Sequence, residues 1–198
     1  AIQALHSLFP KLTTGRRSPV GREEEFLAIR LHSRLAYLYW FHSGKLPCAW
    51  SPLRGMNLAE RYPISSELAQ AYSEHAPALT MVPWYGRALR YVQRSLEIRR
   101  ELGDVWGQGQ SLSFAGVTLY AASRYEEGVE ACAEALRLLE QTGDRWEANT
   151  AGWTRAKCLQ RLGNLPEAAE AAREVYVSAT AIGDKTSAGV SLSVWALA

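Results

Sequence analysis

Apolar residues recur at helical spacing along most of this chain, and short polar turns separate the helical stretches. Leu112, Ala115 and Leu119 lie three or four residues apart, as residues on one face of an α-helix do. The polar pairs Ser123-Arg124 and Gly163-Asn164 interrupt the pattern for only two residues. Because so short a turn reverses the chain, consecutive helices should run antiparallel. The pattern therefore predicts an all-α fold built from helical hairpins.

A Gly-Asp pair repeats every forty residues, and it predicts where each hairpin begins. Glycine reaches the left-handed conformation that ends a helix, and an aspartate side chain accepts from the free N–H groups that open the next one. Trp106 and Trp146 follow two of these pairs, and we expect both to pack against a neighbouring unit. The pairs are Gly103-Asp104, Gly143-Asp144 and Gly183-Asp184. The period predicts units at 23–62, 63–102, 103–142 and 143–182 and a half unit at 183–198, preceded at 1–22 by the end of a helix and a basic loop.

Small residues occur where the two helices of a hairpin should approach closely. In the third unit Gly116 faces Gly128 and Cys132, and in the fourth unit Ala156 faces Ala168. This pattern resembles the tetratricopeptide repeat, over roughly residues 24 to 198. The resemblance implies an α-solenoid, a right-handed superhelical stack of antiparallel helix hairpins whose concave groove binds a partner.

Three residues depart from that pattern in the first two units. Pro52 and Pro77 fall inside expected helices, where each should kink or interrupt the backbone. Tyr37 occupies a position that usually holds a small residue, so it should push two helices apart.

Composition excludes several classes of protein. The 198 residues are 47% hydrophobic, which suffices for a continuous core. The formal net charge of +2 supplies no strong field for nucleic acid or an acidic membrane, and no apolar run is long enough to span a bilayer. Three widely spaced cysteines favour a reducing cytoplasm. The chain begins with Ala1 and stops within an apolar pattern, so we expect a fragment of a longer polypeptide.

Catalytic and metal-binding patterns are weak in this sequence. Gly44-Lys45 lacks the rest of a phosphate-binding loop, and the histidines form no paired metal motif. Glu126, Glu127 and Glu130 lie on one helix face that we interpret as solvated. The basic stretch from Lys11 to Arg22 is interpreted as a solvated loop, with phosphate or nucleic-acid contact as the alternative. We therefore expect no enzymatic activity, no cofactor and no metal.

The tetratricopeptide resemblance also implies which residues line the concave groove. Trp153 differs from the other tryptophans because it aligns with Ser73 and Ser113 at a position that usually faces the groove, where an aromatic side chain either anchors a ligand or packs. The resemblance implies the partner-binding residues Arg34, Leu38, Phe41, His42, Gln70, Ser73, Gln110, Ser113, Tyr120, Trp153 and Lys157.

The forty-residue unit is similar to the arrays in large bacterial signalling ATPases and in related kinase, histidine-kinase and transcription-regulator proteins. That resemblance implies a regulatory scaffold that binds a protein or peptide, including other domains of the same polypeptide. The alternative is a small-molecule sensor that controls an attached ATPase or kinase domain. We also expect the helix after Asp184 to lack its partner, so that Leu192 and Trp195 favour self-association.

Overall fold

The computed structural model describes residues 14–42 and 44–198, with the side chains of 37, 40–42 and 45 left out of the description. Helices dominate these residues, and no strand occurs among them, which confirms the predicted all-α fold. The helices are α3 (Glu23–His42), α4 (Lys45–Ala59), α5 (Ser66–Leu79), α6 (Tyr85–Glu101), α7 (Val105–Ala121), α8 (Tyr125–Thr142), α9 (Arg145–Leu162), α10 (Leu165–Ile182) and α11 (Lys185–Trp195).

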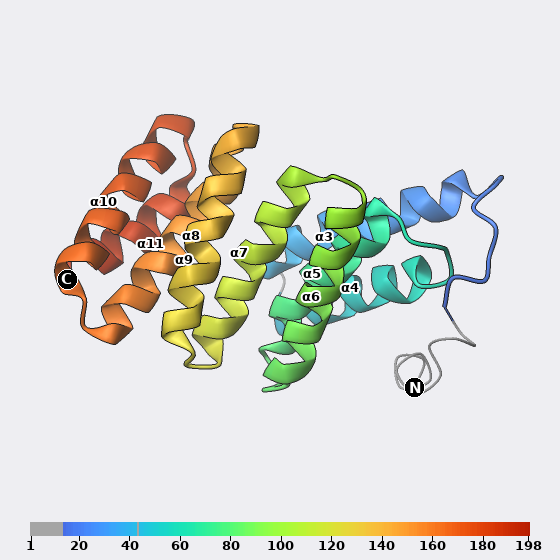
Figure 1. Ribbon diagram of the computed structural model, residues 1–198, viewed down its shortest axis with the longest axis horizontal. Coiled ribbons are helices and arrows are strands. Elements are labelled where there is room, and N and C mark those ends of the chain that lie inside the picture. The colour runs from blue at the N-terminus through green and yellow to red at the C-terminus, as the bar shows by residue number, and fades with distance from the viewer. Residues whose placement is uncertain (1–13, 43) are drawn as a thin grey trace. The chain divides into compact units, whose positions relative to one another are not determined.

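The helices belong to two compact units, residues 1–102 and residues 103–198. In the first unit, α3 packs against α4, α5 against α6, and α5 also contacts α3 and α4. In the second unit, α7 pairs with α8 and α9 with α10, and α11 packs against α9 and α10 (Figure 1). The first helices of successive hairpins, such as α7 and α9, also contact each other. Each unit is therefore a stack of antiparallel hairpins.

The predicted Gly-Asp turns are confirmed. Gly143 ends α8 with a φ of 74°, and the Asp144 side chain accepts from the backbone N–H of Trp146 and Glu147 at 3.1 and 3.0 Å. The indole Nε1 of Trp106 also donates to Asp144, at 2.8 Å. The other two pairs have the same form, with φ of 66° at Gly103 and 74° at Gly183 and caps at Asp104 and Asp184.

We expected Pro52 and Pro77 to kink or interrupt their helices, and the interruption is wrong. Helix α4 continues through Pro52, and α5 continues through Pro77. Both prolines are buried, so tertiary packing holds helical backbone that the missing N–H weakens locally. After Pro77 the helix soon ends, where the Thr80 hydroxyl donates to the Pro77 carbonyl at 2.7 Å. The Tyr37 prediction falls on a side chain outside the described residues.

Glycines in the second unit allow the helices to approach more closely than a β-carbon would permit. A β-carbon on Gly116 would overlap the Sγ of Cys132 on α8, and one on Gly109 would lie 2.7 Å from Leu139. A β-carbon on Gly128 would lie 2.8 Å from the Sγ of Cys158 on α9. These sulfur atoms occupy the space that the missing side chains leave, which explains why the two thiols are fully buried.

The Gly116 contact predicts a large cost for one added methyl group. Gly116→Ala should lower the free energy of unfolding by about 1–3 kcal/mol, because Cys132 or the helix backbone must shift. Gly189→Ala is the matched control, since Gly189 is also helical and a β-carbon there meets nothing within 4 Å. The control should leave stability unchanged or raise it by about 0.5–1 kcal/mol. Urea unfolding measures both, and equal stabilities would contradict the close approach.

Candidate functional site

Two aromatic rings and two cations gather on one face of α7 and α9. The Lys157 ammonium lies over the rings of Trp153 and Tyr120, at 5.2 and 5.8 Å from their centroids. Arg161, one turn further along α9, donates from Nε to the Tyr120 hydroxyl at 3.4 Å. Tyr125, at the start of α8, lies beside Tyr120 with ring centroids 5.8 Å apart. We call Tyr120, Trp153, Lys157 and Arg161 the aromatic-cation cluster.

The packing of α7 against α9 creates this cluster. Residues 120 and 157 lie on different helices, and Trp153 and Lys157 are four residues apart, one above the other on α9. Tyr120, Trp153 and Lys157 are partly exposed, and Arg161 is exposed. Neither Lys157 nor Arg161 forms an ion pair within the described part of the chain. The cluster therefore presents positive charge beside apolar ring surface.

The sequence analysis named three members of this cluster as expected groove residues and missed Arg161. The signal for Arg161 was its spacing, because it follows Lys157 by four residues and so continues the same helix face. The contact with Tyr120 could not be read from that spacing, since it depends on how α7 and α9 pack.

Three of the predicted groove residues are buried, and the prediction that they line an open groove is wrong. Ser73 and Ser113 are fully buried, and Gln110 is 1% exposed. The Gln110 amide donates to Glu147 of α9 at 2.8 Å, and the Ser73 hydroxyl donates to the Gln70 carbonyl at 3.0 Å. The physical reason is that first helices of successive hairpins pack against each other, so central positions on them are covered.

The side chain of Gln70, another predicted groove residue, is already engaged in hydrogen bonds. It is partly exposed, and its amide nitrogen donates to Glu74 at 2.6 Å while its amide oxygen accepts from buried Arg99. Glu74 accepts from Ser33 on α3 as well, at 2.6 Å. Gln70 is thus part of a polar network that joins helices of the first unit.

The predicted groove residues on α3 are accessible where the structure describes their side chains. Arg34 is exposed and Leu38 is 52% exposed, so both are accessible in the first unit. The predictions for Phe41 and His42 fall on side chains outside the described residues.

The described part of the basic loop is held against the end of α4, because Gly15 and Arg17 donate backbone N–H groups to the carbonyls of residues 60 and 61.

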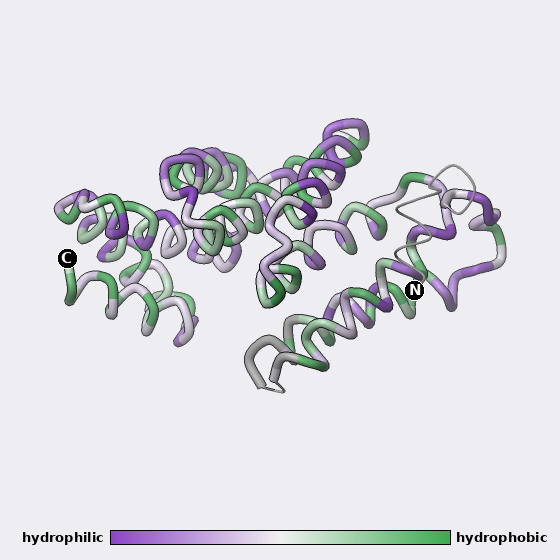
Figure 2. The backbone as a smooth tube through the Cα atoms, turned by 90° about the horizontal axis from the view of Figure 1, so that it is seen from below, coloured by the Kyte–Doolittle hydropathy of each residue, from purple (hydrophilic) through white to green (hydrophobic). Residues whose placement is uncertain are grey.

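The carboxylate face of α8 is exposed, as expected for a solvated surface. Glu127 pairs with Arg124, the residue just before α8, and Glu134 pairs with Arg137 of α8, while Glu126 and Glu130 are exposed. Figure 2 shows hydrophilic and hydrophobic residues interspersed along the helices. Within residues 14–42 and 44–198, no three His, Cys, Asp or Glu side chains are arranged to hold a metal ion. None of the helices described combines the length and hydropathy that a membrane crossing requires.

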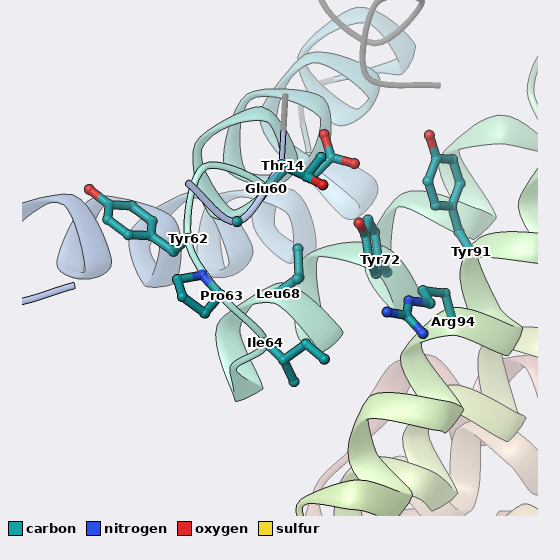
Figure 3. A pocket seen from close by; sticks show the side chains of 10 residues that line it. Thr14, Glu60, Tyr62, Pro63, Ile64, Leu68, Tyr72, Tyr91 and Arg94 are labelled. Carbon is teal, nitrogen blue, oxygen red and sulfur yellow. The ribbon is translucent and has the colours of Figure 1, made fainter. Parts of the chain in front are cut away.

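A pocket of about 610 Å³ opens in the first unit, and the sequence did not predict it. Its walls come from the loop at 14–15, the end of α4, the α4–α5 connection and the facing sides of α5 and α6 (Figure 3). No local pattern could have revealed a lining drawn from so many segments. The lining residues are Thr14, Gly15, Glu60, Tyr62, Pro63, Ile64, Leu68, Tyr72, Tyr91 and Arg94.

Buried His75 lies beside one of these lining residues. Its ring is 5.6 Å from the ring of Tyr91 in an edge-on arrangement, and its Nδ1 has no hydrogen-bond partner among the described residues. Burial, with a smaller effect from the charge of Arg87, lowers the pKa of His75 to about 4. His75 is therefore neutral in the folded protein at pH 7 and resists protonation.

The packed hairpins define this chain as a tetratricopeptide-like helical repeat fold, and comparison with solved structures agrees. A Rap protein complexed with Competence and Sporulation Factor is similar with a TM-score of 0.72 and 19% identity, over 83% of this chain and 46% of the Rap chain. The apo form of RapI gives a TM-score of 0.65 and 16% identity, over 93% of this chain and 64% of that chain.

The tetratricopeptide-like repeats of a putative kinesin light chain from Podosopora anserina are also similar, with a TM-score of 0.61 and 15% identity, over 85% of this chain and 83% of that one. No family model matches the chain, and no curated protein matches its sequence. This chain spans less than two thirds of either Rap chain. At these identities the likeness establishes the fold.

The lowered pKa of His75 predicts acid sensitivity. Below pH 6.5 the unfolded chain binds a proton at this histidine, whereas the folded protein binds it only near pH 4, so stability falls as the pH falls between these values. Linkage gives a loss of about 2 kcal/mol between pH 7 and pH 5. His75→Gln should remove this part of the pH dependence. Urea unfolding at both pH values checks it, and an identical loss in the variant would contradict the assignment.

Proposed function

We propose that this chain is a non-catalytic protein-interaction module, and that the aromatic-cation cluster binds an acidic, extended peptide segment. The observation that carries the proposal is the position of the Lys157 ammonium over two aromatic rings, 5.2 Å from Trp153 and 5.8 Å from Tyr120. Cation–π contacts of this kind hold an ammonium in a defined place before any ligand arrives. A preorganised cation loses less side-chain entropy when it binds.

The two cations and the ring surface of the cluster favour a partner that carries both acidic and apolar side chains. A carboxylate can accept from Lys157 and Arg161 together, since neither cation is ion-paired in the described residues. The partly exposed ring of Trp153 offers apolar surface for a neighbouring side chain of the same peptide. A segment that alternates acidic and apolar residues satisfies both. Arg34 and Leu38 remain proposed contacts of the first unit.

The comparisons support an interaction role only through the fold. One similar structure is a Rap protein in complex with Competence and Sporulation Factor, so a fold of this kind accommodates a bound partner in that protein. The binding residues of this chain are argued from its own cluster.

We further propose that the module regulates a larger bacterial signalling protein in the cytoplasm. The forty-residue unit with its repeated Gly-Asp turn supports the signalling context. The three free and buried cysteines are compatible with a reducing compartment. Partners in this context include other domains of the same polypeptide.

The peptide proposal predicts a specific pattern of binding losses. Peptides selected on the wild-type protein from a displayed random library should be enriched in Asp or Glu beside apolar residues. Trp153→Ala should weaken the selected peptides about tenfold or more, because it removes both the apolar surface and one ring under Lys157. Lys157→Met, which keeps the aliphatic stem and removes the charge, should weaken the acidic peptides. Isothermal titration with purified peptides measures both.

Matched controls separate this site from general electrostatic attraction. Lys185→Met changes the net charge as Lys157→Met does, but at an exposed position on α11, and Glu130→Ala changes the acidic face of α8. Both should leave peptide affinity nearly unchanged. Equal losses in Lys157→Met and Lys185→Met, with the fold intact by circular dichroism, would contradict the proposed site.

Helix α11 motivates a separate prediction of self-association. Val194 is buried against the core of the second unit, whereas Leu192 and Trp195 are 48% and 39% exposed. Exposed apolar side chains on a helix favour contact with another copy. Leu192→Glu should therefore reduce the sedimentation coefficient at high protein concentration. A wild-type protein that sediments as a monomer at all concentrations would contradict this prediction.

A further inference from the structure

The pocket of the first unit has an aromatic and apolar wall. Tyr72 on α5 and Tyr91 on α6 are stacked, with ring centroids 5.4 Å apart and an interplanar angle of 26°. Leu68 and Ile64 extend this wall toward the α4–α5 connection (Figure 3). A volume of about 610 Å³ lies in the range of sites that hold small organic molecules. The wall is therefore suited to the flat, apolar body of such a molecule.

The charged groups of the pocket are not equivalent. Glu60 is 4% exposed, and its carboxylate lies close enough to the Tyr72 hydroxyl to raise the pKa of that phenol, after the larger effect of burial. The Arg94 side chain is 49% exposed and pairs with Glu97 at 3.0 Å. A buried charge acts through a lower effective dielectric than an exposed and paired one. Glu60 therefore dominates the electrostatics inside the pocket.

A carboxylate only accepts hydrogen bonds, and it offers about four acceptor sites, so Glu60 can serve a ligand in addition to its existing contacts. The negative faces of tyrosine rings also attract cations. Both features favour a ligand that carries a positively charged donor, whereas the Glu60 carboxylate would repel an anion.

We propose that this pocket binds a small organic amine with an aromatic ring, the ring resting against the Tyr72 and Leu68 wall and the ammonium donating to Glu60. The lining residues all belong to the first unit, whereas the proposed peptide site is on α7 and α9 of the second. The pocket would add a small-molecule ligand to the proposed interaction role.

A series of three probes of nearly equal size tests this proposal on the unmodified protein. Phenethylamine carries a positive charge, 2-phenylethanol is neutral, and phenylacetate is negative. Isothermal titration should show that phenethylamine binds about tenfold or more tightly than either analogue, as loss of one charged hydrogen bond implies. In methyl NMR spectra, phenethylamine should shift the Leu68 and Ile64 signals and leave Leu139 of the second unit unchanged.

Two variants then test the role of the carboxylate. Glu60→Gln keeps the size and an acceptor oxygen but removes the charge, and it should reduce phenethylamine affinity about tenfold while affecting 2-phenylethanol little. Glu127→Gln is the matched control, because it removes an exposed carboxylate of the second unit, and it should leave affinity unchanged. If Glu60→Gln unfolds the protein, the three-probe series alone decides. Absence of phenethylamine binding, equal binding of the three probes, or shifts confined to other residues would overturn the proposal.

Discussion

The close approach of helices at positions without a β-carbon is the constraint on which the second unit depends. Gly116 admits the Cys132 sulfur, and Gly128 admits the Cys158 sulfur, so α7, α8 and α9 pack through a small residue on one helix and a thiol on the next. Burial raises the pKa of Cys158 to about 11 and raises that of Cys132 further. Both sulfurs are therefore uncharged and act as packing atoms. Close packing around them holds α7, α8 and α9 in one register.

That register creates the candidate peptide site. Because α7 and α9 are held side by side, Tyr120 from one helix lies within reach of Lys157 and Arg161 from the other. The same pairing buries Gln110 against Glu147. In the second unit, one helix contact thus brings some predicted groove residues together and covers another. The cap at Asp144 reinforces this contact, since the Trp106 indole on α7 bonds to the residue that caps α9.

The first unit adds a buried polar network to its apolar core. Buried Arg99 bonds to Gln70, and Gln70 bonds to Glu74, while Met56 belongs to a buried apolar cluster of the same unit. Two helices of this unit contain buried prolines. Because a satisfied polar network makes an interior more rigid, we expect this network to hold its helices in one arrangement. The pocket beside Tyr72 lies in this unit, where stacked rings and a buried carboxylate form part of its lining.

The sequence by itself determined the helices and their turns, because both are local. The forty-residue spacing of the Gly-Asp pairs predicted where left-handed glycines and capping aspartates lie, and the small residues around Gly116 predicted a tight hairpin. Only the tertiary structure decided that Ser73 and Ser113 are covered and that Arg161 reaches Tyr120. Exposure and contact between helices depend on the packing of residues about 40 positions apart, which helical periodicity within one segment does not encode.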